Sequence, residues 1–262
     1  MAPSTPLRLL PERLVGVSTK MYFDLATTQA YVTNVSQLYA SGLSLTIFLI
    51  PDFPSLSEAA RTLESTPHIL LGAQNCHYED RGAYTGEVSP VVLKQVGCSI
   101  VELGHAERRR PPLNETNDIV AAKAQAAVRN HLIPLVCIGE RERSQIVSEG
   151  VALALRECLP QMTSLLSTLT SASDVIFAYE PVWAIGAERP ASADHVLAVV
   201  AELKRAAKKM GRSGQTRFLY GGSAGPGTWT QLKSGLDGLF LGRYAHDLDK
   251  LKQVIQEMEV DG

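Results

Sequence analysis

The sequence predicts an α/β protein folded as a single (β/α)8 barrel. Short apolar runs recur along all 262 residues, amphipathic stretches separate most of them, and no linker or shift in composition divides the chain. Hydrophobic residues make up 45% of the chain and charged residues 20%, which provides for one large core and excludes a disordered chain. Eight such runs favour a closed barrel, and an open doubly wound sheet is the alternative.

The expected strands are rich in Val, Ile, Leu and Phe and alternate only weakly, as is typical of parallel strands buried on both faces. They are Leu14–Ser18, Leu45–Ile50, Ile69–Gln74, Ser99–Gly104, Ile133–Ile138, Asp174–Tyr179, Thr216–Tyr220 and Gly238–Leu241. We expect one domain over residues 1–262, with residues 1–13 as an N-terminal extension.

The clearest helices are expected at Leu25–Ala40, Asn117–Asn130 and Ala193–Lys209, where apolar residues recur at helical spacing. Ser192 suits an N-cap and Gly211 a helix stop. Ser89 followed by Pro90 predicts another helix start, because proline is favoured at the first helical position.

Composition limits the function classes. The formal net charge is -2 and no basic stripe is present, which argues against a nucleic-acid partner. The sequence contains no apolar run of about 18 residues, so we expect no membrane span. The first 14 residues lack the long apolar core of a signal peptide. The cysteines show no CxxC spacing, so we expect reduced thiols in a cytoplasmic protein and neither a disulfide nor a zinc site. They are Cys76, Cys98, Cys137 and Cys158.

Polar residues gather at the C-terminal ends of the expected strands, where the active sites of barrels lie. Lys20 follows the first strand, His105 and Glu107 follow the fourth, and Glu180 follows the sixth. Glycine-rich turns follow the last two. Each feature alone has an ordinary explanation as a solvated lysine, a capping histidine or a tight turn. Together they predict a cation, an imidazole, a carboxylate and two phosphate cradles around one barrel mouth.

Four segments resemble the triosephosphate isomerase family. Ala178–Gly186 (AYEPVWAIG) resembles its lid motif and Gly104–Arg109 (GHAERR) its catalytic-histidine motif, while Gly72–Pro90 is similar to its dimer loop and Tyr220–Ser223 to its phosphate loop. The resemblance covers nearly the whole chain. It implies a TIM barrel enzyme that needs neither a metal nor an organic cofactor and interconverts D-glyceraldehyde 3-phosphate and dihydroxyacetone phosphate, the triose step of glycolysis and gluconeogenesis.

The resemblance also implies roles for individual residues. Glu180 would be the base, His105 the electrophile, Lys20 a fixed positive charge and Glu107 an orienting group, acting through an enediolate. Backbone groups of Gly186, Ser223 and Gly242 would hold the phosphate. The lid Pro181–Pro190 contains Trp183 and Ile185; Ile185 and Leu241 would press on the base, and Tyr220 and Ser223 would latch the closed lid.

The family's dimer loop corresponds to Gln74–Glu87 in this chain. The resemblance implies a homodimer in which Thr85 reaches the partner's site and Glu87 pairs with Arg108 across the interface. Cys137 matches a position behind the base, and Trp229 is expected to pack the short helix after the phosphate loop. The other histidines fit no motif and are expected at the surface or as caps: His68, His77, His131, His195 and His246.

The chain departs from the family's pattern at the site. Ser18 stands where triosephosphate isomerases carry Asn and leaves room near the substrate. Ala106 replaces a usual Ser, and Pro190 should stiffen the second lid hinge. Arg243 replaces the second glycine of the last phosphate cradle, where it either adds a bidentate phosphate contact or points outward.

Ser18 and Arg243 resemble a branch of the family that acts on four-carbon erythrulose phosphates. The alternative activity is therefore the interconversion of L-erythrulose 1-phosphate and D-erythrulose 4-phosphate. A third hypothesis is a non-catalytic phosphosugar-binding or dimeric interaction protein. The presence of Lys20, His105 and Glu180 argues against it.

Overall fold

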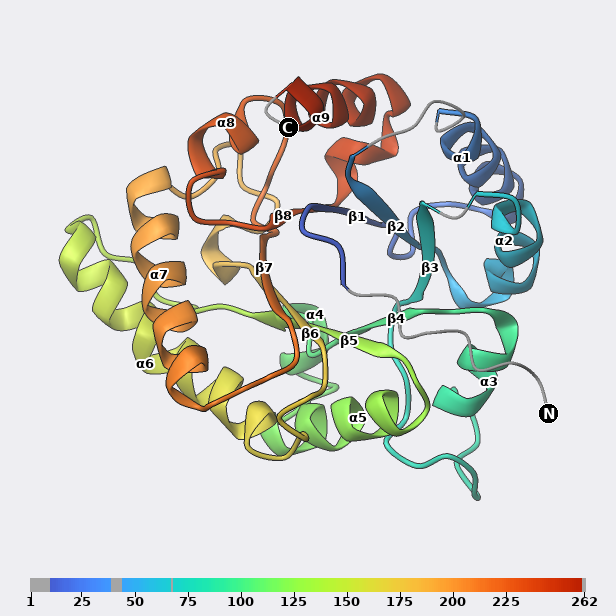
Figure 1. Ribbon diagram of the computed structural model, residues 1–262, viewed down its shortest axis with the longest axis horizontal. Helices are drawn as coiled ribbons and strands as arrows, with labels where there is room; N and C mark the ends of the chain where they lie inside the picture. The colour runs from blue at the N-terminus through green and yellow to red at the C-terminus, as the bar shows by residue number, and fades with distance from the viewer. Residues whose placement is uncertain (1–9, 39–43, 67, 261–262) are drawn as a thin grey trace.

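The computed structural model describes residues 10–38, 44–66 and 68–260 of the chain. Within them, eight parallel strands form a closed barrel in sequential order, with β8 paired back to β1 (Figure 1). The strands are β1 (Leu14–Ser18), β2 (Thr46–Ile50), β3 (Ile69–Ala73), β4 (Ile100–Leu103), β5 (Ile133–Ile138), β6 (Val175–Tyr179), β7 (Thr216–Tyr220) and β8 (Gly238–Leu241). The predicted single-domain barrel is confirmed, and the open sheet is wrong.

Helices form an outer ring around the barrel, except the short α4, which Figure 1 shows near the centre of the view. They are α1 (Leu25–Gln37), α2 (Leu56–Leu63), α3 (Pro90–Val96), α4 (Ala106–Arg109), α5 (Asn117–Arg129), α6 (Val147–Leu166), α7 (Ala193–Lys209), α8 (Thr228–Leu232) and α9 (Leu248–Val260). Short 3-10 turns lie at Phe53–Ser55, Val182–Ala184 and Arg243–His246.

Both helix starts predicted from capping residues are found, and the cap hydrogen bond forms at Ser89 but not at Ser192. The Ser89 hydroxyl accepts a hydrogen bond from the backbone N–H of Val91 at 3.2 Å, and α3 begins at Pro90. Helix α7 begins after Ser192, and Gly211 has a φ of +68°, a left-handed conformation that suits glycine after a helix. The expected end of the first helix at Ala40, like most of the expected N-terminal extension, lies outside the described residues.

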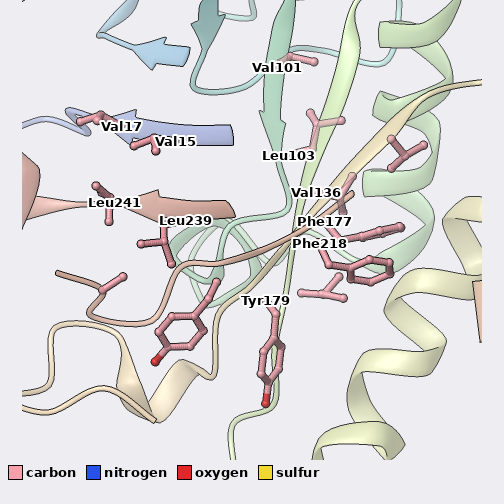
Figure 2. Close-up of a cluster of buried hydrophobic side chains, with 14 of the residues drawn as sticks. Val15, Val17, Val101, Leu103, Val136, Phe177, Tyr179, Phe218, Leu239 and Leu241 are labelled. Atoms are coloured by element: carbon pink, nitrogen blue, oxygen red, sulfur yellow. The ribbon is translucent and has the colours of Figure 1, made fainter. Parts of the chain in front are cut away.

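Two apolar layers hold the barrel together. Alternate residues of each strand belong to the layer that packs against the surrounding helices. Figure 2 shows such side chains on their strands, among them Val15 and Val17 of β1 and Leu239 and Leu241 of β8. The residues between them face inward. This alternation follows from the period of two along a strand and fixes which strand residues reach the interior.

The barrel interior changes from apolar to polar along the strands. Its lower part is filled by Leu14, Phe48 and Phe240, all nearly inaccessible to solvent. Gly16 is required there, because a Cβ at this position would lie 1.9 Å from the Phe48 ring. Near the C-terminal ends the inward residues include Ser18 and Glu102, so the apolar plug becomes the floor of a polar mouth.

Candidate active site

A cavity of about 860 Å³ opens at the C-terminal ends of the strands. It brings together the residues that the sequence singled out from five separate strand ends. Its lining includes Ser18, Lys20, His105, Glu107, Glu180, Ile185, Gly186, Ser223, Leu241, Gly242 and Arg243. The predicted cation, imidazole, carboxylates and glycine cradles therefore share one space.

Glu180 is a buried acidic residue of the cavity with an unsatisfied oxygen. It follows β6, is only 5% exposed, and its Oε2 atom has no hydrogen-bond partner. That oxygen lies 3.5 Å from Nε2 of His105. Burial raises the pKa of Glu180 to about 8, and the nearby charge of Glu102 acts in the same direction. The result is a strongly basic carboxylate with one oxygen free to accept a proton.

Two glycines form the walls beside Glu180. A Cβ at Gly221 would lie 2.5 Å from the Oε1 atom of Glu180. A Cβ at Gly139 would lie 1.9 Å from its backbone oxygen. The chain therefore presents bare backbone to this residue on both neighbouring strand ends.

His105 is held as a neutral donor. It stands immediately before α4, and its Nδ1 atom accepts a hydrogen bond of 3.2 Å from the backbone N–H of Glu107. A nitrogen that accepts carries no proton, so the proton resides on Nε2, which points toward Glu180. Burial lowers the pKa of His105 to about 4, and the charge of Lys20 acts in the same direction. At neutral pH the imidazole is uncharged and donates through Nε2.

Lys20 supplies the positive charge. Its Nζ atom donates to Oε1 of Glu107 at 3.0 Å. Its backbone is left-handed, with a φ of +49°, and Gln74 donates a hydrogen bond of 2.7 Å to its carbonyl oxygen. Burial opposes the charged form, but Glu107 and the more distant carboxylates outweigh it and raise the pKa of Lys20. The ammonium group is therefore permanently charged and fixed at the rim.

Glycine-rich turns form the opposite end of the cavity. Gly186 has a φ of +70°, and a Cβ at this position would lie 3.2 Å from the Nη2 atom of Arg243. The Arg243 guanidinium therefore lies beside Gly186 at the cavity, and its bidentate phosphate contact stays a prediction. The predicted lid contacts the loop after β7: Ser223 donates to the carbonyl of Ala184 at 2.7 Å, and the Tyr220 hydroxyl accepts from the N–H of Ala191 at 2.9 Å.

A second buried carboxylate, Glu140, was not singled out by the sequence. It follows β5, is fully buried, and accepts from the Trp183 indole at 2.9 Å and the Tyr179 hydroxyl at 3.0 Å. Nε2 of His195 lies 3.1 Å from its Oε1 atom. This network anchors the start of the predicted lid, where Trp183 stands.

The expectation that all remaining histidines lie at the surface or act as caps is wrong for His195. His77 fits the capping role, because its Nδ1 atom accepts a hydrogen bond of 3.1 Å from the backbone N–H of Glu79. His195 is buried because its partners Glu140 and Tyr179 lie at the ends of the neighbouring strands β5 and β6. His77 is buried because its ring stacks between Tyr78 and Tyr84. The partners of His195 are distant in the chain, whereas Tyr78 stands directly after His77.

Glu102 is the other functional candidate that sequence reasoning missed. It is 4% exposed, and one of its oxygens accepts a hydrogen bond of 3.1 Å from the Ser18 hydroxyl. Its signal was present in the sequence. Residues 100 and 102 share a face of the strand, so a buried Ile100 places Glu102 inside the barrel.

The residues predicted for a dimer lie away from the cavity. The segment between β3 and α3 projects from the barrel (Figure 1), and Thr85 and Glu87 in it are exposed. Arg108 donates through Nε to Glu115 of its own chain at 2.5 Å. The predicted pair between Glu87 and Arg108 of two subunits stays a prediction.

The described residues also bear on the cysteines, on Trp229 and on two further features. The four cysteines are buried and unpaired. Trp229 is buried within α8, as predicted. No helix in the described part of the chain is long and apolar enough to cross a membrane. Among the same residues, no cluster of three or more His, Cys, Asp or Glu side chains could hold a metal ion.

The fold and the cavity together define a class: (β/α)8-barrel enzymes that move protons on small phosphorylated substrates. A basic carboxylate, a neutral imidazole donor and an ammonium group can take a proton from carbon and stabilise the oxyanion that results. Glycine-rich turns line the other end of the same cavity.

Comparison with known proteins narrows the class. The family model described as triosephosphate isomerase matches residues 13–258. An L-erythrulose-1-phosphate isomerase of Pectobacterium atrosepticum is 38% identical over 251 residues, covering 93% of this chain and 94% of the relative. A protein of the same name from Brucella abortus is 41% identical, covering 90% and 92%, and one from Rhizobium rhizogenes is 40% identical, covering 91% and 92%. The chain belongs to the triosephosphate isomerase family and is an isomerase acting on a sugar phosphate.

Proposed function

We propose that this isomerase interconverts L-erythrulose 1-phosphate and D-erythrulose 4-phosphate. The observation that carries the proposal is that Ser18 and Arg243, where the chain departs from triosephosphate isomerases, both line the cavity that holds Glu180 and His105. The names of the relatives support the same substrate. The sequence had favoured the triose substrate and kept the four-carbon substrate as its alternative, and these observations favour the alternative.

The proposed reaction is a proton transfer between the two inner carbons. Glu180 takes the proton from the hydroxyl-bearing carbon, and the electron pair moves onto the neighbouring carbonyl oxygen to give an enediolate. Nε2–H of His105 donates to the two oxygens and moves a proton between them, while the Lys20 ammonium stabilises the negative charge. Glu180 then returns its proton to the other carbon. Glu107 orients both Lys20 and His105 through the contacts described above.

The glycine-rich end is the proposed phosphate site. Backbone N–H groups of Gly186, Ser223 and Gly242 would hold the dianion, and Arg243 would add a bidentate contact. The lid from Pro181 to Pro190 would cover the site and exclude water, which protects an enediolate from losing phosphate.

A coupled assay with both substrates tests this proposal. We expect kcat/KM for D-erythrulose 4-phosphate to exceed that for dihydroxyacetone phosphate by at least about a hundredfold, which corresponds to roughly 2.7 kcal/mol. A higher kcat/KM for the triose would make the enzyme a triosephosphate isomerase. Turnover of neither sugar, with binding retained, would support the non-catalytic alternative.

Arg243→Gly tests the phosphate contact. We expect KM to rise about tenfold, with a smaller change in kcat, because a charged hydrogen bond is worth about 1.5 to 3 kcal/mol. Lys250→Ala is the matched control, since Lys250 lines the same cavity but stacks its ammonium on Tyr244. An unchanged KM in Arg243→Gly would contradict the contact.

We also propose that the enzyme is a cytoplasmic homodimer. Two exposed features support an interface between subunits. One is the projecting loop around Thr85, and the other is Met21, which stands beside Lys20 at the rim of the cavity. Four buried, unpaired cysteines support a reducing compartment. Light scattering at micromolar concentration is expected to give twice the chain mass of 28.4 kDa, and a monodisperse monomer would contradict the proposal.

A further inference from the structure

Glu102 is a buried acid for which the proposed proton transfer has no use. It lies on β4 beneath the cavity, and its Oε2 atom accepts the Ser18 hydrogen bond. Its Oε1 atom lies 4.0 Å from the sulfur of Cys137. The charged and titratable groups whose interactions act on it are Lys20, Glu107, Arg108, Cys137 and Glu180. An acid in this place has a large desolvation cost, so its contact with Ser18 requires an explanation.

The Ser18–Glu102 contact fixes the hydrogen-bonding role of Ser18. An ionised carboxylate only accepts, so the single hydroxyl proton of Ser18 is directed to Glu102. Burial raises the pKa of Glu102 to about 7, against the opposing effects of Lys20 and the Ser18 hydrogen bond, so the carboxyl is mostly ionised at pH 8. The Ser18 Oγ atom, which belongs to a residue lining the cavity, is then left with lone pairs only.

The Ser18–Glu102 contact lies where we expect the end of the substrate that is farther from the phosphate. In the closed strand order, β4 lies opposite β8, and the Ser18 hydroxyl reaches across the barrel from β1 to β4. The proposed phosphate site lies after β6, β7 and β8. Ser18 itself ends β1, which pairs with β8, and its hydroxyl bonds to Glu102 on β4. A substrate whose phosphate rests at Gly186 and whose reacting carbons lie beside Glu180 and His105 would direct its other end toward β4, and so toward the Ser18–Glu102 pair.

A four-carbon ketose phosphate differs from a triose phosphate at that end. It carries one additional hydroxymethyl group, on the reacting carbon farther from the phosphate. We propose that Ser18 and Glu102 form the subsite for this group, with the Ser18 oxygen accepting the hydrogen bond of the terminal hydroxyl while it donates its own proton to Glu102. This inference rests on the proposed four-carbon function.

The subsite would determine chain-length preference. A bound triose leaves the Ser18 acceptor unpaired, whereas the four-carbon sugar pairs it. Ser18 is the residue that touches substrate, and Glu102 is a positioning residue that acts through it. The longer Asn that triosephosphate isomerases carry here would fill the space that the hydroxymethyl group needs.

The test measures kcat/KM at pH 8 for D-erythrulose 4-phosphate and for an analogue of it in which hydrogen replaces the terminal hydroxyl. In the wild type we expect the analogue to be about tenfold poorer, as for one lost hydrogen bond. In Ser18→Ala we expect this ratio to fall to about one, because the acceptor is gone. Thr19→Val removes the hydroxyl of the next residue and is the matched control, with the wild-type ratio expected.

Glu102→Gln adds a readout that a structural role would not move. The Gln amide can donate to the Ser18 oxygen as well as accept from it, so Ser18 is no longer held as an acceptor for the substrate and the tenfold ratio should shrink. In the wild type, the negative charge of Glu102 also raises the pKa of Glu180. This charge is absent in Glu102→Gln, so the acid limb of the kcat/KM profile should move to lower pH. Thermal unfolding establishes that each variant is folded, and if Glu102→Gln is not, Ser18→Ala alone decides.

The outcomes separate the two proposals. A ratio unchanged in Ser18→Ala, with the wild type still preferring the four-carbon sugar, overturns the subsite and leaves the proposed function standing. A wild type that prefers dihydroxyacetone phosphate overturns both.

Discussion

Two buried glutamates follow neighbouring strands, and they are satisfied in opposite ways. Glu140, after β5, accepts hydrogen bonds from an indole and a hydroxyl and lies next to an imidazole. Glu180, after β6, has one oxygen with no partner. A fully bonded carboxylate holds structure, because removing it leaves buried donors unpaired. An unbonded one is costly to keep, and that cost is explained only by its use.

The largest effect on activity is expected at Glu180, the glutamate with an oxygen that has no hydrogen-bond partner. Glu180→Gln should lower kcat by about a thousandfold, in the range typical of a lost general base, while the affinity for inorganic phosphate changes little. Steady-state kinetics and calorimetry measure the two quantities. Turnover within tenfold of the wild type would show that Glu180 is not the base.

Replacing Glu140, the fully hydrogen-bonded glutamate, should lower the stability of the fold. Glu140→Ala is expected to lower the free energy of unfolding by about 3 kcal/mol, since it leaves the Trp183 and Tyr179 donors buried and unpaired. Chemical denaturation measures the loss. Glu142→Ala is the matched control, because its pair with Arg156 at 3.3 Å is exposed and should change stability by less than about 0.5 kcal/mol. Equal effects for the two variants would remove the distinction drawn above.

The pH dependence of stability sharpens the comparison. Burial raises the folded-state pKa of Glu180 from 4.5 to about 8. Between these values the folded protein keeps a proton that the unfolded chain releases, so wild-type stability falls as pH rises. Glu180→Gln should therefore gain about 2 kcal/mol relative to the wild type between pH 5 and pH 7.

Denaturation at the two pH values tests this gain. Glu140→Gln, which replaces a bonded acceptor, is expected to be less stable than the wild type at both. A stability difference between Glu180→Gln and the wild type that does not change with pH would contradict the cause assigned to the pKa.

The smallest effect is expected at the lid. Trp183→Phe keeps an aromatic ring but removes the indole N–H that donates to Glu140 at 2.9 Å. The loss of one hydrogen bond to a buried carboxylate should cost about 1.5 kcal/mol of unfolding free energy. Thermal denaturation measures it, and Trp229→Phe, whose indole N–H has no partner, is the control. A larger loss in the control would refute the assignment.

The sequence predicted the barrel because eight buried strands and the intervening helices each leave a local pattern. It also predicted Lys20, His105 and Glu180, because strand ends converge in a parallel barrel and those residues stand directly after them. Glu140 and His195 escaped prediction because they are 55 residues apart and become partners only through the pairing of β5 with β6.

Arg243 shows a different limit. The sequence predicted that Arg243 follows the last strand, but not where its side chain points. That orientation depends on the turn after β8 and on the approach of Gly186 from the loop after β6. Glu102, in contrast, was readable from the alternation along β4. Apolar residues flank it on both sides in β4, so the segment has the composition of an ordinary buried strand.

The glycines beside Glu180 bear on how this enzyme can change over evolution. At Gly139 and Gly221 the walls are main chain, and any side chain there would collide with the glutamate. Mutation therefore has almost no means of remodelling the surroundings of the reactive group. Near Ser18 and Arg243 the walls are side chains, which single codon changes can exchange. Descendants of such a barrel inherit the chemistry unchanged and diverge in which sugar they accept.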